Sequence, residues 1–183
     1  GFSKVDVTPD RPVRLSGYGG RNAPFEGVSQ KLWTRAIAMR QADKNETLCV
    51  LVSVDSIGVP ATLTTRIVGQ LKQKHGISRD RFVLCSTHSH AAPQIDGYLT
   101  NHFTIPLTAN EQSEVKRYTA RVEERVVQAV AKAIEDLAPG TLLSGQGQAS
   151  FAVNRRRLKD GRWSGFGVQE DGPVDHSLPV LKV

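Results

Sequence analysis

The chain has 183 residues, a formal net charge of +6, 39% hydrophobic residues and 23% charged residues. These values lie near the globular average, so they predict one folded domain over residues 1–183 and exclude a disordered, collagen-like or disulfide-rich chain. Basic residues are mixed with acidic ones apart from Arg155–Arg157, so we expect no nucleic-acid partner, whereas the positive balance favours anionic membrane surfaces or substrates.

The first third of the chain reads as strands around a glycine-rich loop. Residues Phe2–Val7 alternate apolar and polar side chains, which predicts a strand. The segment Leu15–Gly27 then forms a loop that either brings backbone close to a ligand or is a flexible surface loop. We expect strands at Trp33–Arg40 and Leu48–Asp55, joined by a polar turn at residues 42–46.

A strand, helix, strand unit follows, and its two strands are expected to be parallel. Apolar residues recur at helical spacing after Pro60 until His75-Gly76, which is a helix stop. A short apolar strand at Phe82–Cys85 comes next. Asp55, at the end of the strand before the helix, is a helix cap, a hydrogen-bond anchor or a site residue.

The two cysteines lie inside the apolar strand segments. Cys49 and Cys85 are therefore expected to be small buried core residues. A disulfide between neighbouring strands stays open, because two cysteines do not define a disulfide framework.

The remainder contains a long loop, a long helix and several strands. The apolar residues within 87–106 recur at neither helical nor strand spacing, so this segment is predicted to be a long loop. Thr108 and Glu111 predict a capping box at the start of a helix that ends before Pro139-Gly140. The buried stripe of that helix is expected to be Val115, Thr119, Val122, Val126, Val130, Ala133 and Leu137.

Strand patterns close the sequence. We predict strands over Leu142–Val153 and Val180–Val183, and a hairpin over Leu158–Trp163 that turns at Asp160-Gly161. The pattern stops without a polar tail, so we expect the natural protein to continue beyond it. Together these elements predict an α/β fold, in which a mixed β-sheet with a parallel strand-helix-strand unit and packed helices forms a layered α/β sandwich.

The segment Thr87-His88-Ser89-His90 carries the most specific chemical signal. Alternate side chains of an extended segment point to the same side, so His88 and His90 are expected to share one space just beyond a buried strand. Imidazole is a good zinc ligand, and the carboxyl edge of a sheet is where open α/β folds bind ligands. The alternative is a pair of polar loop histidines whose nitrogens are satisfied by backbone carbonyls.

Other hydrolase families fit the sequence less well. The His-x-His-x-Asp-His motif of the metallo-β-lactamase-like hydrolases needs Asp and His where this chain has Ala92 and Pro93. The sequence contains no Gly-x-Ser-x-Gly elbow and no phosphate-binding Gly-x-x-x-x-Gly-Lys loop.

The segment Thr87–Pro93 resembles the Thr-His-Thr-His-Ser-Gly-Pro signature of the neutral and alkaline non-lysosomal ceramidases. Weaker similarities occur in the family's order over nearly the whole chain, at Ser16-Gly17-Tyr18, Val52–Asp55, Asn154-Arg155 and Val174–Leu181. Two positions depart from the family pattern, since Ala92 replaces a glycine and Arg156 replaces a serine.

The resemblance implies roles for individual residues. His88 matches a ligand of the family's zinc ion (Zn²⁺), and His90 and Arg155 match catalytic groups near the zinc and the substrate head. Gly17, Tyr18 and Asn154 are the corresponding substrate-binding residues. We expect Asp55 to orient a metal-binding residue by contacting that residue rather than the metal itself. The remaining zinc ligands of the family, a second His, a Glu and a Tyr, have no counterpart before Val183.

The resemblance also implies a function and a location. It predicts the N-terminal part of a ceramidase-like catalytic domain that hydrolyses small or lipid amides, resembling the cleavage of N-acylsphingosine to sphingosine and a fatty acid, with peripheral contact to membrane lipids. Family members imply a secreted or periplasmic protein. The alternatives are a non-catalytic lipid- or carbohydrate-binding module on the same fold, and another His-x-His metallohydrolase.

Overall fold

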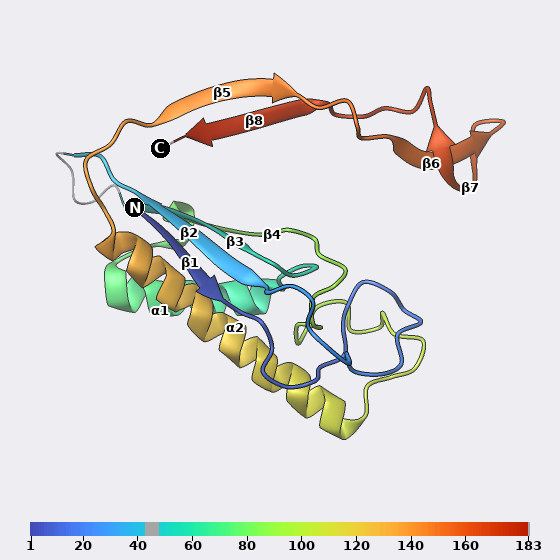
Figure 1. Ribbon diagram of the computed structural model, residues 1–183, viewed down its shortest axis with the longest axis horizontal. Coiled ribbons are helices and arrows are strands. Elements are labelled where there is room, and N and C mark those ends of the chain that lie inside the picture. Colours follow the sequence, from blue (N-terminus) through green and yellow to red (C-terminus); the bar gives the residue numbers. More distant parts are fainter. Residues whose placement is uncertain (43–47, 183) are drawn as a thin grey trace. The chain divides into compact units, whose positions relative to one another are not determined.

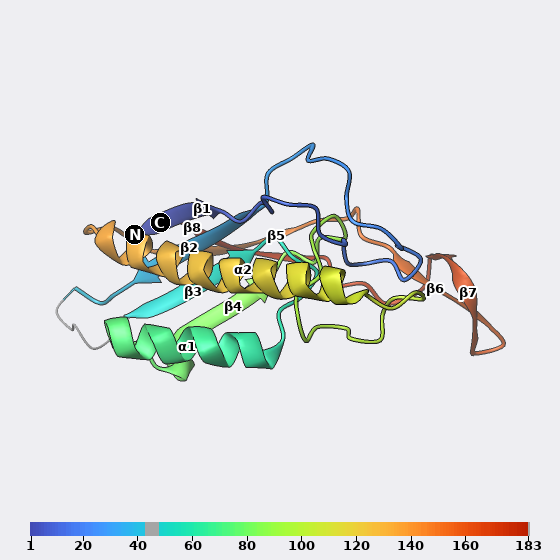
Figure 2. The same cartoon turned by 90° about the horizontal axis from the view of Figure 1, so that it is seen from below.

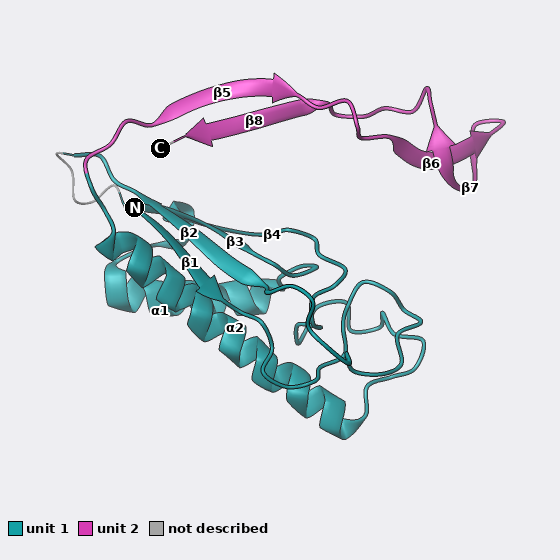
Figure 3. Cartoon of the chain, viewed as in Figure 1, with its two compact units in different colours: residues 1–138 teal, residues 139–183 magenta. Residues whose placement is uncertain are grey.

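The computed structural model describes residues 1–42 and 48–182 of the chain. These residues fall into two compact units, Gly1–Ala138 and Pro139–Val183 (Figure 3). The turn predicted at residues 42–46 lies almost wholly outside the described residues.

The first unit contains a four-stranded mixed sheet with the order β1-β2-β3-β4. Its strands are β1 (Phe2–Asp6), β2 (Trp33–Met39), β3 (Cys49–Val54) and β4 (Phe82–Ser86). β1, β2 and β3 pair antiparallel, whereas β3 and β4 pair in parallel. The predicted mixed sheet and its parallel strand-helix-strand unit are therefore confirmed.

Two helices lie on one face of this sheet, as Figures 1 and 2 show: α1 (Ala61–His75) between β3 and β4, and α2 (Ala109–Glu135) after the long loop. A short 3₁₀ turn, η2 (Arg79–Arg81), precedes β4. Alternation places one set of strand side chains against the helices, so the core combines Val50, Val52 and Val54 of β3 with Leu63, Ile67 and Leu71 of α1.

The capping box predicted for α2 is confirmed. The Thr108 side chain accepts a hydrogen bond from the Glu111 N–H, and the Glu111 carboxylate accepts one from the Thr108 N–H. Six of the seven residues of the predicted stripe are buried, and Leu137 is partly buried just beyond the last residue of α2. The cap thus fixes where the preceding loop meets the helix.

The prediction that both cysteines are buried is wrong. Cys49 and Cys85 are exposed, free thiols. Alternation along β3 and β4 directs Val50 and Phe82 to the helices, so both cysteines point to the other face. Cys85 lies opposite Ser53, four positions along β3 from Cys49. Four strand residues span about 13 Å, which is too far for a disulfide.

The second unit consists of two strand pairs. β5 (Leu143–Gln148) pairs antiparallel with β8 (Ser177–Lys182), and β6 (Asn154–Lys159) pairs antiparallel with β7 (Arg162–Gln169). The predicted hairpin turn is confirmed, since Asp160 and Gly161 have φ angles of 52° and 73°, as a type I′ turn requires. The strand predicted over Leu142–Val153 is shorter than expected and ends at Gln148.

No helix within the described ranges is both long enough and apolar enough to cross a membrane.

Candidate metal and active site

Two loops leave the same edge of the sheet, because β3 and β4 are parallel and end side by side. The Thr87 N–H donates to the Val54 carbonyl at 3.1 Å, and the Ser89 N–H donates to the Ser56 carbonyl at 3.0 Å. The loops after the two strands therefore stay paired beyond the sheet. This contact brings His88 and His90 to the carboxyl edge, where open α/β sheets bind their ligands.

The backbone at the two histidines differs from the extended segment expected from the sequence. His88 has a φ of 58°, in the left-handed region, and the chain turns at His90 and Ala91. The Ala91 N–H donates to the Ser89 hydroxyl at 3.2 Å within this turn. A left-handed non-glycine residue costs roughly 1–2 kcal/mol, so surrounding contacts must hold it in place.

The ring of His88 is oriented by a backbone carbonyl. Its Nδ1 lies 2.9 Å from the Ile57 oxygen. Because a carbonyl only accepts, Nδ1 carries the hydrogen, so in the neutral ring Nε2 holds the lone pair. An imidazole held in this way by its other nitrogen is the usual arrangement of a metal-binding histidine.

The second imidazole meets the first at its free nitrogen. His90 Nε2 lies 3.4 Å from His88 Nε2, and the ring planes cross at 76°. This separation is long for a hydrogen bond. Two nitrogens bound to one tetrahedral zinc at about 2.0–2.1 Å are separated by roughly 3.3–3.4 Å. The geometry of the pair therefore fits a shared metal ion.

The described chain offers these two nitrogens rather than a complete ligand set. Among residues 1–42 and 48–182, no group of three His, Cys, Asp or Glu residues could hold a metal ion.

The glycine-rich loop packs on His90. Gly17 has a φ of 102°, and a Cβ atom there would lie 2.6 Å from His90 Nδ1, closer than real Cβ contacts allow. The Tyr18 ring lies 5.0 Å from the His90 ring, measured between centroids, and is 59% exposed. His90 Nδ1 is buried and has no hydrogen-bond partner within the described residues. Gly17 and Tyr18 are thus brought next to the histidine pair.

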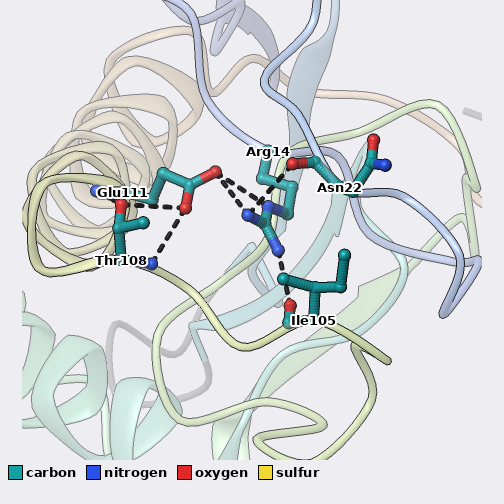
Figure 4. A network of polar contacts seen from close by, with 5 residues as sticks. All are labelled: Arg14, Asn22, Ile105, Thr108 and Glu111. Atoms are coloured by element: carbon teal, nitrogen blue, oxygen red, sulfur yellow. Dashed lines mark hydrogen bonds and ion pairs between the residues drawn. The ribbon is translucent and has the colours of Figure 1, made fainter.

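A buried ion pair anchors the start of this loop to α2 (Figure 4). Arg14 is 2% exposed and donates from Nε and Nη2 to Glu111 Oε1 at 2.9 and 2.6 Å. It also donates to the carbonyls of Ile105 and Asn22. Burial by itself raises the pKa of Glu111, but hydrogen bonds from Thr108 and Arg14 outweigh it and hold that pKa below its ordinary value.

Asp55 takes a different position from the two histidines. Its carboxylate accepts a hydrogen bond from the Trp33 N–H at 2.8 Å and pairs with Arg35 at 3.2 Å. These bonds join the start of β2 to the end of β3. Among the described residues, the Asp55 carboxylate therefore contacts Trp33 and Arg35 rather than an imidazole. The role of Asp55 in orienting a ligand stays a prediction.

Asp55 and Arg35 line a cavity of about 400 Å³. The same cavity is lined by alternate residues of the histidine segment, namely Thr87, Ser89, Ala91 and Pro93. Its walls also include apolar side chains of the glycine-rich loop, such as Leu15 and Phe25. The histidine segment therefore presents one set of side chains to this cavity and its two imidazoles to each other.

Asn154 and Arg155 lie on β6 in the second unit. The Asn154 amide donates to the Pro173 carbonyl at 3.1 Å, and its oxygen accepts from the Arg156 N–H at 3.0 Å. Both residues line an open pocket of about 460 Å³ with Phe166. Their predicted contacts to substrate stay predictions.

Sequence reasoning missed two groups that orient the histidines. One is the Ile57 carbonyl, whose role depends on a backbone contact across 31 residues. The other is Arg21, whose guanidinium donates to the His90 carbonyl at 2.5 Å. Arg21 is the one basic residue between Leu15 and Gly27, and this isolated charge in a glycine-rich loop could have singled it out.

Comparison with known proteins gives consistent results. Residues 1–159 match the sequence profile described as neutral/alkaline non-lysosomal ceramidase, N-terminal. Neutral ceramidase 3 of Arabidopsis thaliana is 27% identical over 159 residues, which cover 85% of this chain and 21% of that protein.

Solved structures share the fold. The neutral ceramidase of Pseudomonas aeruginosa superposes with a TM-score of 0.71 at 21% identity, covering 85% of this chain and 24% of that one. A ceramidase complexed with C2 superposes with a TM-score of 0.69, with the same identity and coverage. The chain thus spans only about a fifth to a quarter of the length of these relatives. On its match over residues 1–159, the chain belongs to the neutral/alkaline non-lysosomal ceramidase family and corresponds to the N-terminal part of its members.

Proposed function

We propose that the chain forms the N-terminal part of a zinc-dependent amide hydrolase that cleaves the N-acyl bond of ceramide, giving sphingosine and a fatty acid. Family membership and the names of the relatives support the reaction class. The observation that carries the proposal is the 3.4 Å separation of the two Nε2 atoms of His88 and His90 at the carboxyl edge of the sheet.

In this proposal the metal and the two histidines have separate roles. When bound, zinc supplies a Lewis acid for the amide carbonyl and lowers the pKa of a bound water towards about 7. His88 would hold the metal through Nε2, with the Ile57 carbonyl fixing its tautomer. His90 Nε2 faces the same point, 3.4 Å from His88 Nε2, and would be the second nitrogen at the metal.

Other side chains bind the substrate in this proposal. By the family resemblance, Arg155 and Asn154 would contact the polar head of the substrate, and Arg155 would stabilise negative charge on it. Gly17 and Tyr18 form the wall beside His90. Asp55 keeps the strand ends in register below the site through Trp33 and Arg35.

We also propose peripheral contact with anionic membrane lipids through the β6–β7 hairpin. Trp163 and Phe166 are 60% and 72% exposed, and their rings lie 5.9 Å apart between centroids. Residues 156–162 of the hairpin include Arg156, Arg157, Lys159 and Arg162 but only one acidic residue, Asp160. Exposed aromatics with basic neighbours are typical of segments at a lipid interface. The family resemblance underlies the further proposal that the protein is secreted or periplasmic.

Zinc binding by the 183-residue chain tests the metal site. We expect the His88→Ala and His90→Ala variants each to lower zinc affinity by at least about tenfold in calorimetric titration, since each removes one of the two nitrogens. His75→Ala is the matched control, because His75 lies in the last turn of α1. Equal zinc affinity in the wild-type chain and the His88→Ala variant would remove His88 from the site.

Hydrolysis tests the reaction in the longer protein that contains this chain. We expect release of fatty acid from labelled ceramide, and loss of that activity in the His88→Ala protein. Turnover of simple N-acyl amino compounds but not of ceramide would restrict the proposal to amide hydrolysis and reject the lipid substrate.

A further inference from the structure

Arg21 makes three contacts around His90. Its Nη1 donates to the His90 carbonyl at 2.5 Å and also donates to the Ser16 carbonyl. Its guanidinium carbon lies 4.9 Å from the centroid of the Tyr18 ring, within the range of a cation–π contact. One side chain therefore joins the glycine-rich loop to the backbone of His90.

The neighbouring contacts between the two segments stop short of His90. The Gln94 N–H donates to the Arg14 carbonyl and the Ser16 N–H donates to the Ala92 carbonyl, both at 2.9 Å. These backbone bonds hold residues 14–16 against residues 92–94. Beyond them the chain turns, so the next polar link between the two segments is the bond from Arg21 to the His90 carbonyl.

The loop that carries Arg21 is itself held firmly. Arg14 and Glu111 fix its start to the first turn of α2, and the Arg21 N–H donates to the Tyr18 carbonyl at 3.2 Å, closing a turn. The Thr104 N–H donates to the Gly19 carbonyl at 2.9 Å and secures its middle. Arg21 thus belongs to a loop that is anchored at its start and in its middle, rather than to a loose surface loop.

We propose that Arg21 is a positioning residue, which holds the His90 ring against His88 so that the two Nε2 atoms face one point. This inference rests on the proposed function, because the convergent pair is the proposed metal site. Without the guanidinium, the His90 carbonyl loses its donor and the Tyr18 ring loses its cationic neighbour. His90 can then swing away from His88, while the strands and helices of the first unit keep their own contacts.

The test compares Arg21→Gln and Arg21→Lys with Arg11→Gln in the 183-residue chain. Arg11→Gln makes the same charge change at an exposed arginine, whose ion pair among the described residues is with Glu114 at 4.0 Å. We expect zinc affinity to fall about tenfold in Arg21→Gln, to take an intermediate value in Arg21→Lys, and to stay at the wild-type value in Arg11→Gln. Urea unfolding of each variant reports whether the fold is kept.

A metal-free readout accompanies the titration. In the wild-type chain and in Arg11→Gln, we expect nuclear Overhauser contacts between the ring protons of His88 and His90, and we expect their loss in Arg21→Gln. A folded Arg21→Gln chain with the wild-type ring contacts and zinc affinity would overturn the inference. If Arg21→Gln does not fold, a folded Arg21→Lys chain that equals the wild type in both readouts overturns it as well.

The two proposals fail in different ways. If His88→Ala and His90→Ala bind zinc as the wild type does, the proposed metal site fails, while the ring contacts still decide the role of Arg21. If those two variants lose zinc and Arg21→Gln does not, only the positioning role fails.

Discussion

Replacing Gly17 with alanine tests the packing of the glycine-rich loop on His90. The new Cβ would lie 2.6 Å from His90 Nδ1 and 2.7 Å from Cγ, and the φ of 102° is a conformation that L-residues rarely adopt. The backbone strain costs about 1–3 kcal/mol, and forcing an extra carbon against the ring costs about 1–3 kcal/mol more. We therefore expect a loss of about 2–6 kcal/mol of unfolding free energy if His90 keeps its position.

A second outcome is also consistent with the geometry, because the imidazole can move away and relieve the overlap. Stability then falls by only about 1–3 kcal/mol, while zinc affinity falls with the loss of the convergent pair. Urea unfolding and zinc titration of the same sample separate the two outcomes.

Gly20 provides the matched control in the same loop. A Cβ atom there would meet nothing within 4 Å, and its φ is not positive. Gly20→Ala should therefore change stability by no more than about 0.5 kcal/mol. The reasoning is refuted if Gly17→Ala leaves both stability and zinc affinity at the wild-type values.

Three further predictions follow from single contacts. Glu111→Gln should lower the free energy of unfolding, measured in urea, by about 3 kcal/mol, because it leaves the buried Arg14 guanidinium without its carboxylate partner. A loss below about 1 kcal/mol would contradict this. Burial raises the pKa of Asp6, but hydrogen bonds from Thr8 and Lys31 outweigh it and lower that pKa from 3.8 to about 2. Because this pKa is lowered, the Asp6 carboxylate stabilises the fold fully above pH 4 and loses this effect as the pH falls towards 2. In urea unfolding, the free energy of unfolding of Asp6→Asn should therefore fall less steeply than that of the wild type between pH 4 and pH 2, and equal slopes would contradict the prediction. Trp163→Ser should weaken binding to phosphatidylserine-containing vesicles by about tenfold or more, since burying one aromatic is worth about 1.5–3 kcal/mol, and unchanged binding would remove the hairpin as the lipid contact.

The sheet and helices of the first unit were predictable because each has a clear period and clear ends. Alternation identified β1, a strand-like composition identified β2, and the capping box at Thr108 located the start of α2. The burial of Cys49 and Cys85 was predicted wrongly, because an apolar run does not reveal that only one face of its sheet is covered by helices.

The histidine pair was predictable in its composition but not in its geometry. The spacing of His88 and His90 indicated a shared space, yet their rings meet through a left-handed residue and a turn rather than an extended strand. The partners that orient them, the Ile57 carbonyl and Arg21, lie 31 and 69 residues away in sequence. No local pattern records such contacts, because they arise only when the loops of β3, β4 and the N-terminal segment meet.

The interleaving of side chains along the histidine segment has a consequence for how the protein can change. The cavity wall uses Ser89 and Ala91, whereas the imidazoles at positions 88 and 90 face each other. A substitution at Ala91 reshapes the cavity without removing either nitrogen, and a substitution at position 88 or 90 leaves the wall side chains unchanged. Within a few consecutive codons, natural selection can thus retune the hollow beside the sheet while the pair of imidazoles is preserved.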